Sequence, residues 1–309
     1  MRRLIVVAVL ISACSSDSGS EKQAPTGSMD VGTDVAIDTG AQDDSGSATL
    51  PDANTPDAAQ ACDIEDYGGA GPLQVTFETT GPGGNFRLDR PVADPPAGGY
   101  PAIVFSVGTG GSPRNYSALL EHFASYGFVV ISGDSGNQGD GTQALEGIRW
   151  LMAETEDTNS AYFGLIDPAR VAATGHSQGG NAAIYVGIKE PKIAAVVTLA
   201  AGKGQLGGVE PADDTQLTQP VFYICGSEDT IVPPAWCDER FAAAPSPAWK
   251  AVVTGAPHNG PRLDVGQYWN VATMWMLAKL QNVCGPQQAF DGPDFALQSV
   301  LGLEGIERK

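Results

Sequence analysis

The stretch that decides the fold of this chain is Val171-Ala172-Ala173-Thr174-Gly175-His176-Ser177-Gln178-Gly179-Gly180-Asn181-Ala182-Ala183. Its first four residues form a short run typical of a buried strand, and the small residues that begin at Asn181 open a helix expected over 181–188. Between them, residues 175–179 match the pattern G-x-S-x-G, which describes a sharp turn from strand to helix that exposes its serine. The alternative is a structural glycine turn whose serine has no chemical role. The setting favours a strand, a tight turn with Ser177 at its tip, and a closely packed helix.

Strand and helix patterns alternate on both sides of this stretch. Short apolar runs rich in β-branched residues predict strands, and apolar positions three or four residues apart predict helices. The expected strands are 74–79, 86–92, 102–107, 128–132, 171–174, 193–199, 221–224 and 249–253, and the expected helices are 115–126, 144–153, 181–188 and 265–280. This alternation predicts an α/β fold with a mostly parallel central sheet, helices on both faces, and two antiparallel strands leading into the sheet.

The N-terminus has the features of an export signal. Two arginines precede a short apolar run, and small residues follow it before Cys14. The run is too short to cross a bilayer, which takes about 20 apolar residues. The tetrapeptide at 11–14 resembles a bacterial lipobox, a signal whose cysteine is acylated and becomes the mature N-terminus. We therefore expect a lipoprotein signal peptide over 1–13 and lipidation of Cys14, with an ordinary cleaved signal as the alternative.

Residues 14–61 have the composition of a disordered acidic tether. They consist mostly of Ser, Gly, Asp, Thr, Ala and Pro, contain no aromatic residue, and have Lys22 as their single basic residue. Such a segment cannot bury enough apolar surface to offset its chain entropy. A flexible spacer between a lipid anchor and a domain over 62–309 is expected, rather than a binding tail. The protein would then lie outside the cytoplasm. The outer membrane or cell surface is favoured, because the signal that retains lipoproteins at the inner membrane is an aspartate after the cysteine, and here Ser15 follows Cys14.

Charge and cysteine content narrow the function further. The net charge of −19 argues against nucleic acid as a partner, because phosphates require Lys and Arg. Neutral substrates suit such a chain better. Besides Cys14 there are four cysteines, which permit three pairings. We expect Cys62 to pair with Cys284, joining the ends of the domain, and Cys225 with Cys237 across one loop. Their spacing does not fit a zinc cluster, so no metal is expected.

An exposed serine needs a base, and the chain has only three histidines. His122 lies inside an expected helix, at the surface or the edge of the core. His176 adjoins Ser177, and the tight turn is expected to direct its side chain toward a substrate cleft. His258 lies in a Gly- and Pro-rich loop that follows a late strand, a common place for a catalytic side chain. Elimination and position therefore favour His258 as the base.

The base in turn needs a carboxylate to orient it. Asp229 follows the strand expected at 221–224, and functional groups of an open parallel sheet gather at the carboxyl ends of its strands. Glu228 is its nearest rival. Backbone N–H donors for an oxyanion are expected at Gln178, directly after the serine, and at Thr109 in the glycine-rich loop 108–112. A phosphate-binding loop is the competing interpretation, but no Gly-Lys-Ser/Thr sequence completes it.

With these residues in place, the domain resembles the bacterial polyester hydrolase and cutinase group of α/β-hydrolases. The resemblance runs from about residue 74 to about residue 280, and it rests on the segments 124–131, 175–179, 227–233 and 255–258. It implies an α/β-hydrolase fold in which Ser177, Asp229 and His258 form the catalytic triad. The family's oxyanion donors fall on Thr109 and Gln178.

One further family residue can be carried over, and some cannot. The apolar residue two positions beyond the catalytic aspartate, which lines the acyl cleft, falls on Ile231. The family usually has an aromatic residue where Thr109 stands and methionine where Gln178 stands. It also places tryptophan after the sixth strand, and residues 198–203 contain none. The resemblance therefore does not extend to the aromatic clamp that grips polymer rings.

Together these features predict a monomeric serine hydrolase that cleaves carboxylic esters, either short-chain acyl esters or polyesters, through an acyl-enzyme. No metal or organic cofactor is implied, and contact with the membrane is expected through the lipid anchor only. A surface binding protein of the same fold that has lost catalysis is one alternative. A peptidase is another, since fold does not fix the leaving group. A dienelactone-type hydrolase is a third, although such enzymes more often use cysteine as nucleophile.

Overall fold

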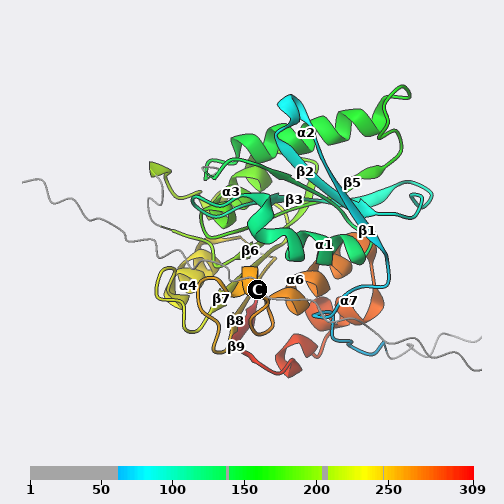
Figure 1. Ribbon diagram of the computed structural model, residues 1–309. Coiled ribbons are helices and arrows are strands. Elements are labelled where there is room, and N and C mark those ends of the chain that lie inside the picture. Colours follow the sequence, from blue (N-terminus) through cyan, green and yellow to red (C-terminus); the bar gives the residue numbers. More distant parts are fainter. Residues whose placement is uncertain (1–61, 137–138, 204–207, 246) are drawn as a thin grey trace, which may run out of the picture. The chain divides into compact units, whose positions relative to one another are not determined.

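The computed structural model describes residues 62–136, 139–203, 208–245 and 247–309 (Figure 1). The expected signal peptide, the lipidation site Cys14 and the acidic tether over 14–61 lie outside the described residues. In the part that is described, no helix combines the length and the apolar character needed to cross a membrane.

A single twisted sheet forms the centre of the described domain. Its strand order is β1-β2-β4-β3-β5-β6-β7-β8-β9. The bounds are β1 Val75–Thr80, β2 Phe86–Pro91, β3 Tyr100–Ser106, β4 Val129–Gly133, β5 Ile166–His176, β6 Ile193–Leu199, β7 Val221–Gly226, β8 Ala248–Val253 and β9 Leu303–Arg308. Strands β3 to β8 run parallel, whereas β1, β2 and β9 pair antiparallel with their neighbours. The predicted mostly parallel sheet, with two antiparallel strands leading into it, is confirmed.

Helices cover both faces of this sheet, as predicted. They are α1 Ser117–Ser125, α2 Thr142–Glu156, α3 Gln178–Lys189, α4 Pro234–Ala243, α5 Gly260–Leu263, α6 Tyr268–Met276 and α7 Cys284–Asp291. Alternate residues of each central strand belong to different clusters of the core. Ile103 and Phe105 of β3 pack with residues of α1, α6 and α7, whereas Ala102 and Val104 pack with residues of α2, α3 and α4. The sheet therefore divides the core into two apolar layers.

The sequence patterns missed α4, α5, α7 and β9. The β9 segment Leu303-Glu304-Gly305-Ile306-Glu307-Arg308 has only two apolar residues, and it forms the sheet's outer edge beside β8. The single long helix expected over 265–280 is instead α6 followed by a π-helical turn at Leu277–Gln281. The edge strand has few apolar residues and the missed helices are short, so they leave a weak periodic pattern.

Two disulfides fix the ends and one loop of the domain, in the pairing that we expected. Cys62 pairs with Cys284 at the start of α7, across a sequence separation of 222 residues. Cys225 at the end of β7 pairs with Cys237 in α4. Disulfides of this kind persist in oxidising compartments.

His122, expected at the surface or at the edge of the core, is buried with only 4% of its surface exposed. Its Nε2 lies 2.9 Å from the hydroxyl of Thr273, and its ring packs between those of Tyr126 and Trp269. Burial lowers the pKa of His122 to about 4, from an ordinary value of 6.5. The folded domain therefore holds this ring neutral.

This buried neutral ring predicts a loss of stability in acid. Between pH 6.5 and about 4 the unfolded chain binds a proton at His122 that the folded chain does not, so the unfolding free energy falls as the pH falls. We expect His122→Gln to reduce the slope of unfolding free energy against pH by up to about 1.4 kcal/mol per pH unit in this interval. Urea unfolding at about pH 7.5, 6 and 5 measures the slope.

The control for this experiment is Thr273→Val, which removes the hydroxyl partner and keeps the imidazole. It should retain the wild-type slope although it costs stability at every pH. Equal slopes for His122→Gln and the wild type would show that the imidazole does not govern acid stability.

Candidate active site

Four loops converge at the carboxyl edge of the parallel strands. They follow β3, β5, β7 and β8, and they carry Thr109, Ser177, Asp229 and His258 respectively. These residues lie far apart in the sequence, yet parallel strands deliver the loops that follow them to one edge of the sheet. The topology therefore brings together the residues that the sequence singled out.

The turn that carries Ser177 leaves no room for side chains around it. Ser177 has φ 58° and ψ −118°, a backbone conformation that L-residues rarely adopt. A Cβ on Gly175 would lie 2.6 Å from the carbonyl oxygen of Ser106, and one on Gly180 would lie 2.7 Å from the Cβ of Ala201. Only glycine permits this approach of α3 to strand β5 and its neighbours. Glycine at 175 and at 180 is therefore required by packing, and the serine hydroxyl is placed at the tip of the turn.

Ser177, His258 and Asp229 form one chain of hydrogen bonds. The Oγ of Ser177 lies 2.9 Å from Nε2 of His258, and Nδ1 of His258 lies 2.7 Å from Oδ2 of Asp229. A carboxylate can only accept, so Nδ1 donates to Asp229. Nε2 of the neutral ring is then the acceptor of the serine hydroxyl proton. Ser177 and Asp229 are buried, with 6% and 3% of their surfaces exposed.

The local environment of Asp229 keeps it ionised. Burial alone would raise the pKa of this carboxyl, but hydrogen bonds from His258 and from two backbone N–H groups outweigh burial and hold the pKa below its ordinary value. The backbone donors are Ile231 and Val232, at 2.8 and 2.7 Å from Oδ1. Glu228, the rival candidate, is exposed to solvent. The geometry brings Asp229, and not Glu228, to the histidine.

The loop after β3 presents a backbone donor beside Ser177. Gly110 donates its N–H to the carbonyl oxygen of Gly136, and Gly111 donates to that of Gly108. Within the described ranges the N–H of Thr109 makes no hydrogen bond to the protein, so it can serve a ligand. Gln178 is the first residue of α3, where backbone N–H groups lie beyond the helix's own hydrogen-bond ladder.

His176 connects two of these loops, and Tyr116, which the sequence analysis missed, completes the connection. The Nε2–H of His176 donates to the backbone carbonyl of His258 at 2.7 Å. Its Nδ1 accepts from the hydroxyl of Tyr116 at 2.8 Å, and that hydroxyl accepts from the N–H of Gly108 at 3.0 Å. Burial, followed by the charge of His258, lowers the pKa of His176 to about 3, so the ring stays neutral.

A cleft of about 460 Å³ opens at this edge of the sheet. Its lining includes Ser177, His258 and Thr109, and also Ile231, of which 54% is exposed. His176 lines the cleft as well, but both of its ring nitrogens are occupied by protein groups. The sequence analysis did not identify Arg262, a further lining residue. Its position within the turn-like helix α5 has no sequence signal of its own.

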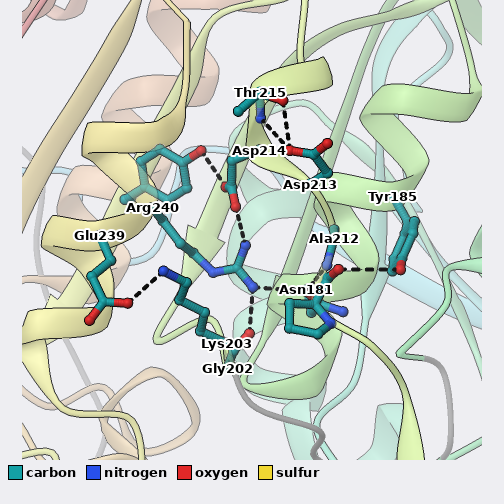
Figure 2. A network of polar contacts seen from close by, with 12 residues as sticks. Asn181, Tyr185, Gly202, Lys203, Ala212, Asp213, Asp214, Thr215, Glu239 and Arg240 are labelled. Atoms are coloured by element: carbon teal, nitrogen blue, oxygen red, sulfur yellow. Dashed lines mark hydrogen bonds and ion pairs between the residues drawn. The ribbon is translucent and has the colours of Figure 1, made fainter.

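Behind Ser177, a buried ion pair fixes the start of α3 (Figure 2). Arg240 of α4 is 1% exposed, and its Nη1 lies 2.6 Å from Oδ2 of Asp214. Its Nη2 donates to Oδ1 of Asn181 at 2.8 Å and to the carbonyl oxygen of Gly202 at 2.5 Å. The N–H of Gly202 in turn donates to the carbonyl oxygen of Ser177 at 3.0 Å. Arg240 therefore connects α4 to the turn that carries Ser177, through Asn181 and Gly202.

Known proteins are similar to this chain over the part of the domain that holds the four loops. A family model described as PETase, PET hydrolase-like, matches residues 92–264, more than half of the chain. Cutinase est2 of Thermobifida alba is 30% identical over 179 residues, which cover 55% of this chain and 57% of that protein. Cutinase 2 of Thermobifida cellulosilytica is 34% identical over 104 residues, covering 32% and 39%. The chain thus spans less than two thirds of either relative. The family match includes all four converging loops, and the chain belongs to the PET hydrolase-like family of α/β-hydrolases.

Proposed function

We propose that this chain is a serine hydrolase that cleaves carboxylic esters through an acyl-enzyme. The observation that carries the proposal is the hydrogen-bonded chain from Ser177 through His258 to Asp229 at the floor of an open cleft. Membership of the PET hydrolase-like family and similarity to proteins named cutinases support an ester as substrate. No step of the proposed reaction calls for a metal or an organic cofactor.

In the first half-reaction, His258 takes the proton of Ser177 through Nε2, and Oγ attacks the ester carbonyl carbon. Asp229 holds the ring in the required tautomer and stabilises the imidazolium that forms. The negative charge that develops on the carbonyl oxygen is bound by the N–H groups of Thr109 and Gln178. Loss of one such donor typically costs about 3 kcal/mol of transition-state stabilisation.

The first half-reaction ends when the imidazolium of His258 gives its proton to the departing alcohol oxygen, which leaves the acyl group on Ser177. In the second half-reaction, a water molecule gives a proton to Nε2 and attacks the acyl carbon. Collapse of this intermediate releases the carboxylic acid and returns the proton to Oγ of Ser177. The net reaction consumes one ester and one water, and it yields one acid and one alcohol.

Esters with a short acyl chain are the substrates that the cleft best supports. Ile231 offers an exposed apolar contact at its side. The chain has Thr109 and Gln178 where the family usually has an aromatic residue and methionine, and residues 198–203 contain no tryptophan. A polyester is the second candidate, and the family match favours it.

Export, lipid anchoring at Cys14 and a monomeric state belong to the same proposal. The two disulfides Cys62–Cys284 and Cys225–Cys237 support folding in an oxidising compartment outside the cytoplasm. Such a location would let the enzyme meet extracellular esters.

The first prediction concerns the nucleophile. Ser177→Ala should reduce hydrolysis of 4-nitrophenyl butyrate by more than about 1,000-fold, because it removes the hydroxyl that His258 contacts and that would form the acyl-enzyme. A fluorophosphonate probe should label the wild type at Ser177, as peptide mapping would show. Ser160→Ala, in the loop before β5 at the opposite edge of the sheet, is the control and should behave as wild type. Undiminished labelling of Ser177→Ala would refute the assignment.

The second prediction distinguishes the two neighbouring carboxylates. Asp229→Asn should lower kcat by about 1,000- to 10,000-fold, because His258 then loses its acceptor and adopts the wrong tautomer. Glu228→Gln, an equal change of charge one residue away, should stay within about twofold of the wild type because its side chain is exposed. Steady-state kinetics on the same ester measures both. If Glu228→Gln were the inactive variant, Asp229 would lose its role.

The third prediction concerns the hydroxyl of Tyr116. Tyr116→Phe keeps the ring against Phe105 but leaves the N–H of Gly108 and Nδ1 of His176 without their partner. Unfolding free energy should fall by about 1–3 kcal/mol. The value of kcat should fall by about 10- to 100-fold, because the loops of Thr109 and His258 shift.

The control for this variant is Tyr126→Phe. The hydroxyl of Tyr126 donates to the carbonyl oxygen of Gly69 at the surface, so its removal should change neither kcat nor stability by much. Equal behaviour of the two Phe variants would mean that the link through His176 does not position the loops.

A further inference from the structure

The active-site cleft contains a cation to which the proposed mechanism gives no role. Among the described residues that line the cleft, Arg262 is the only Lys, Arg, Asp or Glu side chain. It lies on α5, the short helix that follows the His258 loop. The chain as a whole has a net charge of −19, so a cation placed at the reacting groups runs against the overall composition.

The guanidinium of Arg262 lacks a strong partner in the protein. Its Nε is buried from solvent and has no hydrogen-bond acceptor. Its only hydrogen bond among the described residues is a long one, 3.5 Å from Nη1 to Oδ1 of Asn259. By contrast, Arg87, Arg149 and Arg240 each meet a carboxylate at 2.6–2.7 Å. A buried N–H without an acceptor costs free energy, and a ligand that supplies the acceptor recovers it.

The position of Arg262 is set by the same residues that hold the active-site loops. The guanidinium carbon lies 5.5 Å from the ring centroid of Tyr116, within range of a cation–π interaction. The hydroxyl of Tyr116 is bonded to His176, which is bonded to the backbone of His258. The fork of donors on Arg262 is therefore held at the cleft wall, beside the residues that would carry out ester cleavage.

We propose that Arg262 binds a carboxylate of the substrate, and that the preferred substrates are anionic esters such as monoesters of dicarboxylic acids. Hydrolysis of such a monoester yields the dicarboxylate and one alcohol. This inference rests on the proposed ester hydrolysis and names its substrate class. It also refines the sequence-based expectation of neutral substrates, because the net charge of the chain does not describe the charge inside the cleft.

The chemistry of the guanidinium suits a carboxylate as its partner. Its planar fork of N–H groups matches the two oxygens of a carboxylate, and such charge-assisted pairs are among the strongest hydrogen bonds in proteins. The net negative charge of the chain repels anions from a distance, but salt screens that repulsion over about 10 Å, whereas a contact within the cleft is screened much less. Direct contact with Arg262 would thus decide the preference.

Two pairs of substrates test the proposal, and within each pair a free carboxylate in one ester is replaced by a methyl ester in the other. Monomethyl adipate and dimethyl adipate carry the difference on the acyl side, and 3-acetoxybenzoate and its methyl ester carry it on the alcohol side. The measured quantity is the ratio of kcat/KM for the charged ester to that for the neutral one. A ratio cancels any general loss of activity that a variant suffers.

Arg262→Gln should lower this ratio by at least about tenfold in one of the two pairs, which corresponds to about 1.4 kcal/mol. Arg262→Lys should restore part of the ratio because it keeps the charge but not the fork. Arg114→Gln is the matched control: Arg114 is exposed and lines a different hollow, so the ratio should equal that of the wild type. Ratios within about twofold for wild type and Arg262→Gln in both pairs would overturn the proposal.

A binding measurement separates failure of this inference from failure of the proposed function. In the Ser177→Ala background, calorimetry should detect adipate binding that Arg262→Gln weakens by at least about tenfold. Hydrolysis of the neutral esters together with unchanged adipate binding in Arg262→Gln would leave the esterase proposal standing and refute the role of Arg262. Absence of ester hydrolysis together with Arg262-dependent adipate binding would refute the esterase proposal and retain the carboxylate site.

Discussion

The close contact between β5, α3 and the neighbouring backbone is the constraint on which the site depends. Gly175 and Gly180 permit this contact because any Cβ there would collide with Ser106 or Ala201. As a result the chain reverses within a few residues and holds Ser177 at a positive φ of 58°. Strain of this kind persists only where surrounding structure over-determines it. Here the hydrogen bonds to Leu199, at the end of β6, and to Gly202, in the loop that follows it, supply that support.

Much of this arrangement could be predicted from the sequence because it depends on local patterns. Alternation of apolar runs predicted the parallel sheet, and the glycine spacing at 175–179 predicted the turn. Elimination among three histidines selected His258, and the carboxyl-edge rule selected the loop after the strand at 221–224, with Asp229 preferred and Glu228 left as its rival. The geometry places His258 beside Ser177 at 2.9 Å and Asp229 beside His258 at 2.7 Å.

The residues that the sequence could not predict act through contacts between distant elements. Tyr116, Arg240 and Arg262 belong to three different helical segments, and none stands in a recognisable motif. A tyrosine in an amphipathic helix is usually a core residue, and an arginine on a short helix is usually solvated. Tyr116 bonds to His176, Arg240 pairs with Asp214, and Arg262 lines the cleft. Only folding brings these groups together. Likewise, edge strand β9 carries little apolar surface, so it left no clear pattern.

The disulfide between Cys225 and Cys237 constrains the segment that carries Asp229. The bond joins the end of β7 to α4, and the segment that it encloses contains Asp229. Arg240, one turn further along α4, reaches back to the loop behind Ser177. Formation of this one disulfide therefore constrains both the segment that carries Asp229 and the helix that carries Arg240. With the two thiols reduced, noncovalent contacts alone would connect β7 to α4 on either side of this segment.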